Sequence, residues 1–489
     1  MKFVNVLFVV LLYCTHLSAQ VTLPNNLYFT HIGVEDGLCQ NTVCCILQDH
    51  LGFIWLGTKD GLTRYDGYRF RVFKHDAADP MSIGNNFIRV LYEDADGLIW
   101  IGTNVGVYIY NPETENFRKF DVATERGDVI SREVSSIKCD SSGDLWIGVN
   151  WQGVFRYDRR DESLELYEPV PGDTTSLSSV HVWDLCFDGD GNLWVGSQNG
   201  GLDRYDRETD RFVRHRLKGL SDVSRIVLDK QNQLLLGTMK DGLFSFNPYM
   251  GTCQPLLLDS GHKDLFVRAI FVRNSREVVV GTENGIYIYD CVTRKTRHVN
   301  QELGNPYSLS CKAVYSIYCD KEGALWIGTY FGGVNYLPPS SSLIFDKFYP
   351  IGHSDRLSGK AVREFVRDEN GIIWIGTEDQ GLNRFDPVSG KFTHYNSRNS
   401  GLSCDNVHGL CVDGDRLYIG TFFGGFNIMD LKTNEIVALG SQMLPDDSVF
   451  SIFRDHDGRI WVGLTYGLCL FHPEDGAFEL VREIPENLF

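Results

Sequence analysis

Pairs of carboxylates are the most frequent feature of this sequence that could do chemistry. Two aspartates stand two residues apart at Asp94/Asp96, Asp188/Asp190 and Asp455/Asp457. Such pairs could bind a cation or act as general acid and base. Each pair lies within an Asp-x-x-Gly sequence, however, and a tight turn also needs an aspartate side chain and a glycine at these places. We therefore interpret the pairs as turn residues.

Known catalytic and metal-binding motifs are missing from the sequence. The segment Asp188-Gly-Asp190-Gly-Asn192 resembles a calcium loop, but Leu193 replaces the required glycine and no glutamate closes it. There is no G-x-S-x-G, H-E-x-x-H or phosphate-binding Walker sequence, and no Cys/His spacing of a metal site. We expect no catalytic residue, no metal and no cofactor.

A second group of residues could bind a ligand without transforming it. Aromatic rings offer flat apolar faces to sugar rings, and Arg and His donate hydrogen bonds to hydroxyls or carboxylates. The candidates in turns are Trp151, Gln152, Tyr330, Phe331, Phe422 and Phe423, beside Asn150. The candidates at the starts of strands are His181, Trp183, Arg225, Arg268, Arg363 and His408, together with Arg132. For any single member, packing or a solvated surface is the simpler interpretation, and the set carries the hypothesis.

One repeat supplies the elements that position these residues. Asp368-Glu-Asn-Gly371-Ile-Ile-Trp374-Ile-Gly376-Thr377 has a close copy at residues 49–58, and further copies centre on other tryptophans. Seven of the nine tryptophans occupy this one position of the repeat. The glycine two residues later recurs ten times, at intervals of 41 to 48 residues: Gly57, Gly102, Gly148, Gly196, Gly237, Gly281, Gly328, Gly376, Gly420 and Gly463.

Each repeat is predicted to form four short strands, as residues 362–368, 372–377, 382–386 and 391–395 illustrate. A four-stranded sheet cannot cover its own faces, but radial stacking of such sheets covers both. The fold class is therefore all-β, a β-propeller with four-stranded antiparallel blades, and the repeated Trp packs between blades. The turn between the second and third strands must lie on the same face as the start of the first, which brings both groups of candidates to one face.

The ten repeats are predicted to divide into seven and three. Pro338-Pro339-Ser340-Ser341-Ser342 is the one Pro/Ser cluster between repeats and indicates a linker. Phe29-Thr30-His31-Ile32 resembles a fourth strand without its first three, and it would close the seventh blade. Residues 20–340 then form a seven-bladed propeller. Residues 341–489 begin a second ring with an orphan fourth strand at 345–349 and only three blades, as if the chain were the front part of a longer or shortened protein.

The beginning of the chain and its composition indicate an exported protein. Residues 1–19 combine an early lysine, a short apolar run and small residues before Gln20, which predicts a signal peptide and a periplasmic location. The formal net charge of −18 is opposite to that of a phosphate-binding surface, so we expect no nucleic-acid partner. The 13 cysteines show no disulfide framework, although one or two disulfides are compatible with their positions.

The repeats resemble the two-component-regulator propeller repeats in the periplasmic sensor region of Bacteroidetes hybrid two-component systems. Gly37-Leu38, Asn41-Thr42-Val43, the copy at residues 49–67, and Thr329–Tyr336 carry the resemblance, which covers residues 27–475. In that family two seven-bladed propellers precede an immunoglobulin-like domain, a membrane helix and cytoplasmic kinase and DNA-binding regions. Members sense oligosaccharides and switch on polysaccharide-utilisation genes. This sequence contains no membrane helix, phospho-accepting His motif or receiver Asp, so the resemblance implies only the sensing role.

Three functions follow as hypotheses. The first is an extracytoplasmic oligosaccharide-sensing region, attached to the membrane only through parts that this sequence lacks, with a homodimer as one possible state. The second is a stand-alone propeller for protein interaction, or a shortened gene product that does not signal. The third is a propeller lyase, since some antibiotic-cleaving lyases are similar at the level of the repeat.

Overall fold

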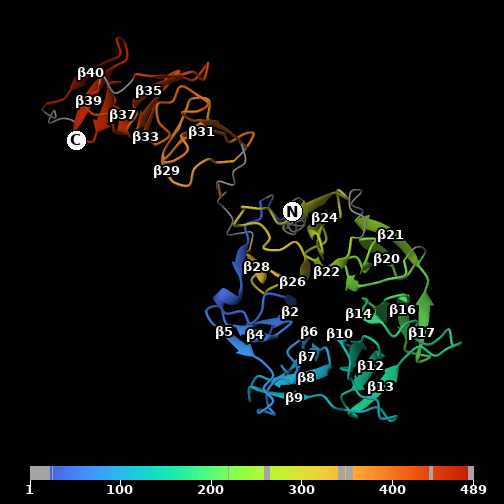
Figure 1. Cartoon of the computed structure of the whole chain (residues 1–489). Coiled ribbons are helices and arrows are strands. Elements are labelled where there is room, and N and C mark those ends of the chain that lie inside the picture. The colour runs from blue at the N-terminus through green and yellow to red at the C-terminus, as the bar shows by residue number, and fades with distance from the viewer. Residues whose placement is uncertain are drawn as a thin grey trace, which may run out of the picture. The chain divides into compact units, whose positions relative to one another are not determined.

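The computed structural model describes residues 22–24, 26–217, 220–257, 265–339, 347–348, 356–439 and 444–482. These residues form ten four-stranded antiparallel sheets, which confirms the predicted all-β fold class (Figure 1). The predicted signal peptide, residues 1–19, and most of the predicted linker and orphan strand lie outside the described residues. Among the described residues the one helical element is the short 3-10 turn η2 (Val34–Asp36).

The chain forms two compact units, Met1–Glu302 with Pro306–Ile344, and Leu303–Asn305 with Phe345–Phe489. The first unit holds seven sheets, here called blades 1 to 7. Blade 1 is β2 (Val43–Gln48), β3 (Ile54–Thr58), β4 (Gly61–Tyr65) and β5 (Phe70–Phe73); blade 2 is β6 (Ile88–Glu93), β7 (Ile99–Thr103), β8 (Gly106–Asn111) and β9 (Asn116–Lys119); blade 3 is β10 (Val134–Cys139), β11 (Leu145–Val149), β12 (Gly153–Asp158) and β13 (Ser163–Tyr167); blade 4 is β14 (Val182–Phe187), β15 (Leu193–Ser197), β16 (Gly201–Asp206) and β17 (Arg211–His215).

The remaining blades of the first unit follow in chain order. Blade 5 is β18 (Arg225–Leu228), β19 (Leu234–Gly237), β20 (Leu243–Asn247) and β21 (Thr252–Leu257); blade 6 is β22 (Val267–Val272), β23 (Glu277–Thr282), β24 (Gly285–Asp290) and β25 (Thr296–Val299); blade 7 is β26 (Val314–Cys319), β27 (Leu325–Thr329), β28 (Val334–Leu337) and β1 (Thr30–Ile32).

The second unit holds three sheets, blades 8 to 10. Blade 8 is β29 (Val362–Arg367), β30 (Ile373–Thr377), β31 (Leu382–Asp386) and β32 (Lys391–Tyr395); blade 9 is β33 (Val407–Asp413), β34 (Arg416–Thr421), β35 (Gly425–Asp430) and β36 (Ile436–Ala438); blade 10 is β37 (Val449–Arg454), β38 (Ile460–Leu464), β39 (Gly467–His472) and β40 (Ala477–Leu480).

The seven blades of the first unit close into a ring. The first strands of successive blades contact one another from β2 to β26, and β26 contacts β2 again (Figure 1). Strand β1, which precedes blade 1 in the sequence, completes blade 7, because it pairs with β28 in the register Thr30↔Tyr336 and Ile32↔Val334. The His31 ring also hydrogen-bonds the Ser308 carbonyl at 2.7 Å. In the second unit β29 contacts β33 and β33 contacts β37.

In each of the seven repeats that carry the Trp, its Nε1 donates to the repeated Asp, and six of these seven bonds are buried. Trp194 Nε1 donates to Asp188 Oδ2 at 2.8 Å. Asp188 Oδ1 accepts the backbone N–H groups of Asp190 and Asn192, which fixes the tight turn between the first two strands. The Asp-x-x-Gly sequences therefore act as turns, and one oxygen of each Asp also satisfies the N–H of a Trp buried between blades.

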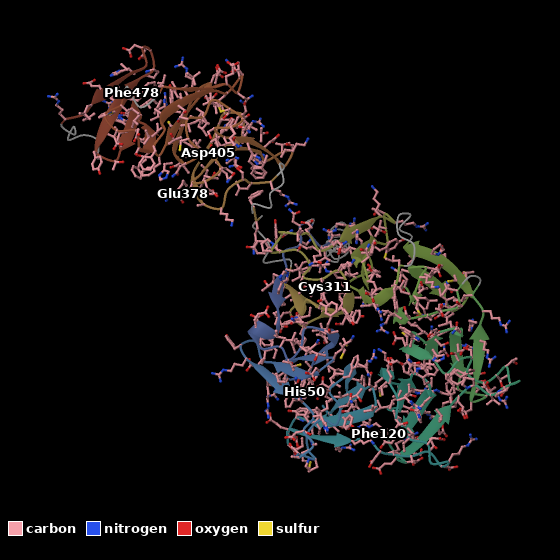
Figure 2. The ribbon with its side chains drawn as sticks, in the orientation of Figure 1. His50, Phe120, Cys311, Glu378, Asp405 and Phe478 are labelled. Atoms are coloured by element: carbon pink, nitrogen blue, oxygen red, sulfur yellow. The ribbon has the colours of Figure 1, made fainter. Side chains whose placement is uncertain are left out.

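The repeated glycine lets neighbouring blades approach closely. A Cβ atom on Gly237 would lie 2.6 Å from Val267 Cγ1, and one on Gly420 would lie 2.4 Å from Val449 Cγ1. Both valines are fully buried and start the first strand of the following blade. Aromatic side chains also pack here, including Phe120 against Trp100 in the first unit and Phe478 against Phe471 in the second. Figure 2 labels Phe120 and Phe478.

The twelve described cysteines are all free thiols, so none of the disulfides considered from the sequence forms among them. No helix in the described ranges has the length and hydrophobicity needed to cross a membrane.

Candidate functional site

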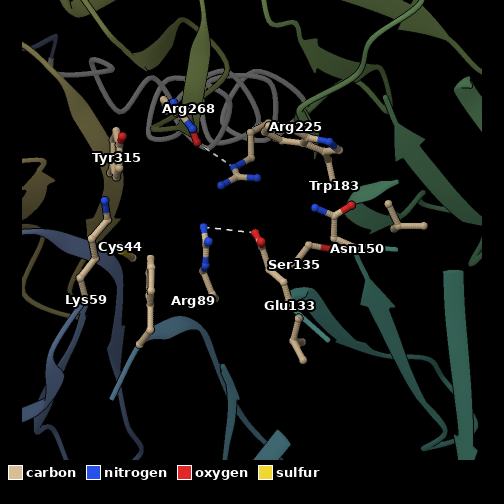
Figure 3. Close-up of a pocket in the computed structure, with 13 residues that line it drawn as sticks. Cys44, Lys59, Arg89, Glu133, Ser135, Asn150, Trp183, Arg225, Arg268 and Tyr315 are labelled. Carbon is tan, nitrogen blue, oxygen red and sulfur yellow. Dashed lines mark hydrogen bonds and ion pairs between the residues drawn. The ribbon is translucent and has the colours of Figure 1, made fainter. Parts of the chain in front are cut away.

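A cavity of about 230 Å³ lies in the first unit, where the first strands of all seven blades converge (Figure 3). Its lining includes four cationic side chains, one carboxylate, three aromatic rings and several small polar groups. The residues are Cys44, Lys59, Phe87, Arg89, Glu133, Val134, Ser135, Asn150, Val182, Trp183, Arg225, Arg268 and Tyr315.

Six of these residues occupy the same position of the repeat, a β-bulge near the start of the first strand. In blade 4, Val182 pairs with Ser197 and Asp184 with Gly196, so that Trp183 is the extra residue between two pairs. A bulge residue is left out of the strand pairing, which frees its side chain to point where the ladder would not place it. The six bulge residues that line the cavity are Cys44, Arg89, Ser135, Trp183, Arg268 and Tyr315.

Blade 5 departs from this pattern. Its first strand starts at Arg225, which pairs with Gly237 as Cys45 pairs with Gly57 in blade 1. Arg225 is thus one position later than the bulge residues, and it still reaches the cavity. Its guanidinium donates to two backbone carbonyls, those of Arg268 at 2.7 Å and Ser224 at 2.9 Å.

The residue that follows the second strand holds the bulge residue of the same blade. Arg89 donates to Asn104 Oδ1 at 2.7 Å, and Arg268 forms an ion pair with Glu283 at 2.6 Å. The Tyr315 and Tyr330 rings pack with centroids 5.1 Å apart. These partners orient the side chains that face the cavity.

The cavity has an excess of positive charge. Arg89 pairs with Glu133 at 3.2 Å (Figure 3), and Arg268 is neutralised by Glu283. Within the described part of the chain, Lys59 and Arg225 form no ion pair. The Lys59 ammonium lies instead over the Tyr330 ring, 4.1 Å from its centroid.

Burial shapes the chemistry of two groups in the cavity. Desolvation lowers the pKa of Arg225, opposed by the Asp184 carboxylate and assisted by the nearby Arg268 and Arg89 charges. Desolvation raises the pKa of the Cys44 thiol to about 11, in spite of four nearby cations. Cys44 is therefore a neutral thiol at physiological pH and removes none of the positive charge.

Four of the candidates from the sequence line the cavity, namely Asn150, Trp183, Arg225 and Arg268. Tyr330 lies directly behind the cavity wall, against Tyr315 and Lys59.

Trp151 and His181 form an aromatic pair beside the cavity. Their ring centroids are 4.1 Å apart, and His181 Nδ1 lies 3.2 Å from Oδ1 of Asn150, which lines the cavity. The Trp151 side chain is 65% exposed and its backbone adopts φ = 70°, so its ring projects from the turn and is available to a ligand.

The other predicted residues of the first unit have different surroundings. Gln152 accepts from the Ser131 N–H and donates to the Val129 carbonyl, which holds a loop. Phe331 is 69% exposed and packs edge-on against Tyr330. Arg132 is exposed and does not line the cavity, whereas its neighbour Glu133 does.

The predicted residues of the second unit occupy the same positions of their own repeats. Arg363 and His408 are bulge residues, and Phe450 is the third. Arg363 pairs with Glu378 at 2.7 Å. The His408 ring stacks on Phe422 at 5.5 Å, and Phe423, which is 69% exposed, contacts Phe422 at 4.1 Å.

Sequence reasoning missed several cavity residues, above all Lys59, Arg89, Glu133 and Tyr315. The signal that could have found them is position in the repeat. Each of the six bulge residues directly follows the Val or Ile that begins a first strand. Aligning the repeats on this Val or Ile would therefore have selected the six bulge residues, Arg89 and Tyr315 among them. The described residues contain no group of three His, Cys, Asp or Glu side chains arranged to hold a metal ion.

Comparison with known proteins identifies the repeat. Six segments match the family model described as the two component regulator propeller, at residues 37–60, 82–105, 176–199, 308–331, 356–379 and 443–466. Each segment runs from before a first strand to the turn after the second strand. It therefore contains the bulge position of the first strand and the position directly after the second strand.

Solved structures and one curated protein are also similar. The extracellular domain of the hybrid two-component system BT3049 of B. thetaiotaomicron is 23% identical, with a TM-score of 0.65 over 94% of this chain and 74% of that one. The corresponding domain of BT4673 is 20% identical, with a TM-score of 0.57 over 93% of this chain and 67% of that one. Both likenesses establish a shared fold. "Histidine kinase P4" of Formosa agariphila is 39% identical over 59 residues, which are 12% of this chain and 4% of that protein.

Proposed function

We propose that this chain, which belongs to the proteins built from two-component-regulator propeller repeats, is the extracytoplasmic ligand-sensing region of a hybrid two-component regulator. In this proposal the ligand is an oligosaccharide, and its binding signals for polysaccharide utilisation. Residues 20–340 form the ligand-binding propeller and residues 341–489 begin a second one. The sensing region is exported to the periplasm and performs no catalysis.

The convergence of bulge residues on one cavity carries this proposal. The scaffold glycine recurs in all ten blades and the Trp in seven of them, whereas the six bulge residues are of five types. Packing of identical blades does not call for such variety at one position. A binding site does, because it needs several kinds of hydrogen-bond donor and an apolar surface around one ligand.

The residue types suit a saccharide. Arg side chains donate to hydroxyl groups, and Asn and Ser side chains donate to or accept from them. The exposed Trp151 ring offers a face to the C–H groups of a sugar. Ligand-sensing regions need only bind, so the proposal requires no catalytic group.

Calorimetric titration of the chain with size-matched oligosaccharides tests the proposal. We expect one member of the panel to bind with a stoichiometry of one, and to raise the melting temperature because it binds only the folded state. Trp183→Ala removes an aromatic wall of the cavity and should weaken binding at least tenfold. Absence of heat with every glycan class would overturn the proposal. In cells, transcription of polysaccharide-utilisation genes should respond to the same oligosaccharide and lose that response in Trp183→Ala.

A further inference from the structure

The charges of the cavity indicate which saccharides it would accept. Four cationic side chains, Lys59, Arg89, Arg225 and Arg268, face a cavity whose lining includes one carboxylate, Glu133. This excess is local, since the whole chain carries a formal net charge of −18. A positive cavity in a strongly acidic protein needs an explanation in terms of what enters it.

Ion pairing accounts for two of the four cations. Glu133 neutralises Arg89 and Glu283 neutralises Arg268. The carboxylate whose charge acts on Arg225 is that of Asp184, but the two side chains form no ion pair. Asp184 instead accepts hydrogen bonds from Ser136 Oγ, the Leu185 N–H and the Ile226 N–H, at 2.9 to 3.0 Å. Two positive charges thus remain without a matching carboxylate.

The two uncompensated cations are placed to meet a ligand. The Arg225 guanidinium is held by backbone carbonyls at Nε and one terminal nitrogen, so its position is fixed before any ligand arrives. A half-buried guanidinium gains most from an oxyanion, because planar N–H donors match two oxygens at once. Lys59 rests on the faces of Tyr330 and Phe87, which support the ammonium without neutralising it.

We propose that the cavity of the first unit binds an acidic saccharide, whose carboxylate or sulfate group is held by Arg225 and Lys59. This inference rests on the proposed sensing function and names the class of its ligand. Neutral oligosaccharides would leave both cations unpaired in a partly dehydrated cavity, and they are discriminated against for that reason. Trp151, beside Asn150 at the cavity, is placed to stack on a neighbouring sugar ring.

Paired ligands that differ only in charge test the inference. The probes are trigalacturonic acid against its methyl ester, and a sulfated galactan oligosaccharide against its desulfated form, each titrated into the full chain at low and high salt. We expect one acidic probe to bind at least tenfold more tightly than its neutral counterpart, with the difference shrinking as salt rises. The two pairs separate a carboxylate from a sulfate as the group recognised.

Charge-removing variants locate the binding site. Lys59→Met and Arg225→Met should each weaken the acidic probe at least tenfold while changing binding of the neutral probe little. Lys119→Met and Arg118→Met remove the same charges from the exposed outer strand β9 and serve as matched controls without effect. Arg225→Lys keeps a charge and should restore part of the binding, which guards against a folding defect in Arg225→Met.

Each outcome bears on one proposal. Equal binding of acidic and neutral probes would overturn the acidic-saccharide inference and leave sensing intact. Acidic binding that survives both Lys59→Met and Arg225→Met would overturn the assignment to this cavity. If neither acidic probe binds, the acidic-saccharide inference is overturned, whereas the proposed sensing function fails only when every glycan class gives no heat.

Discussion

Asp203 shows how a single side chain can tune the stability of a blade. Its carboxylate is fully buried in blade 4, where Oδ2 accepts from the Ser178 N–H and hydroxyl at 2.9 and 2.6 Å. Oδ1 has no hydrogen-bond partner among the described residues. Three other blades carry an asparagine at this position and keep the same bond from a serine N–H: Asn335 from Ser310, Asn383 from Ser358 and Asn427 from Ser403.

We predict that Asp203→Asn stabilises the protein at neutral pH. Desolvation raises the pKa of Asp203 to about 6, above its value of about 3.9 in an unfolded chain. Between these two values the folded chain binds more protons than the unfolded chain, so stability falls as the pH rises from about 4 to 6 and stays lower above. The asparagine escapes this loss, which for a shift of about two units is on the order of 3 kcal/mol.

Urea unfolding at pH 4.5 and 7.5 measures this effect. The variant should exceed the parent in unfolding free energy at pH 7.5, and the gap should narrow to roughly a third of that value at pH 4.5, where Asp203 is still protonated in the folded chain. Asp121→Asn, at an exposed site, is the control and should change neither value. A variant no more stable than the parent at pH 7.5 would show that Asp203 is satisfied as a carboxylate.

At the scale of elements, β1 is the piece that closes the ring. β1 lies near the start of the first unit's sequence and β28 near its end, and the two strands pair over Thr30–Ile32. Phe29 just before it is buried in the core of blades 6 and 7. Without this strand β28 would be an open edge, and the hydrophobic contacts around Phe29 would be lost.

We predict that removing residues 22–33 lowers the stability of the first unit by several kcal/mol, from the lost burial of Phe29 and Leu23 and the lost strand pairing. Urea unfolding followed by tryptophan fluorescence measures it, and a synthetic peptide of residues 22–36 added in excess should restore most of the loss. Restoration should fail with a peptide carrying Phe29→Asp. Unchanged unfolding after the deletion would refute closure by β1.

The sequence predicted the elements well and the site only in part, for a physical reason. Period-two patterns, Asp-x-x-Gly turns and the Trp position depend on local chemistry, so strands such as β32 appear where the sequence places them, at Lys391–Tyr395. The site depends on a one-residue bulge, which changes where a side chain points without changing hydrophobicity. Trp183 and Arg268 stood out by residue type, whereas Ser135 and Cys44, at the same position, did not. Lys59 was missed because its role comes from Tyr330, which lies six blades away along the chain and is adjacent in the closed ring.

At the scale of the whole molecule, the two compact units differ in how well their sheets are covered. In the first, every blade is packed on both sides by neighbours around the ring. In the second, blades 8 and 10 each have one neighbouring blade among the described residues, and Phe365 and Phe453 on their first strands are 70% and 62% exposed. The second unit therefore buries less apolar surface per residue and should be the less stable one.

We predict two calorimetric transitions, the lower from the second unit. Val449→Ala, at the contact with Gly420, should lower only the first transition, and Val267→Ala, at the matching contact with Gly237, only the second. Each substitution removes buried methyl groups and should cost about 1–3 kcal/mol. A single transition shifted equally by both variants would show that the units unfold together. A ligand of the first unit should raise the upper transition alone.

The bulge in each first strand has a consequence for how such a chain can change over generations. Residues such as Cys44 and Tyr315 stand outside the strand pairing and outside the contacts between blades that Trp and Gly make, so replacing them leaves the architecture unaltered. New specificities can therefore arise through single codon changes at a few positions, without compensating mutations elsewhere. The same property suits protein engineering, in which a combinatorial library at these positions would yield receptors for new ligands on one unmodified frame.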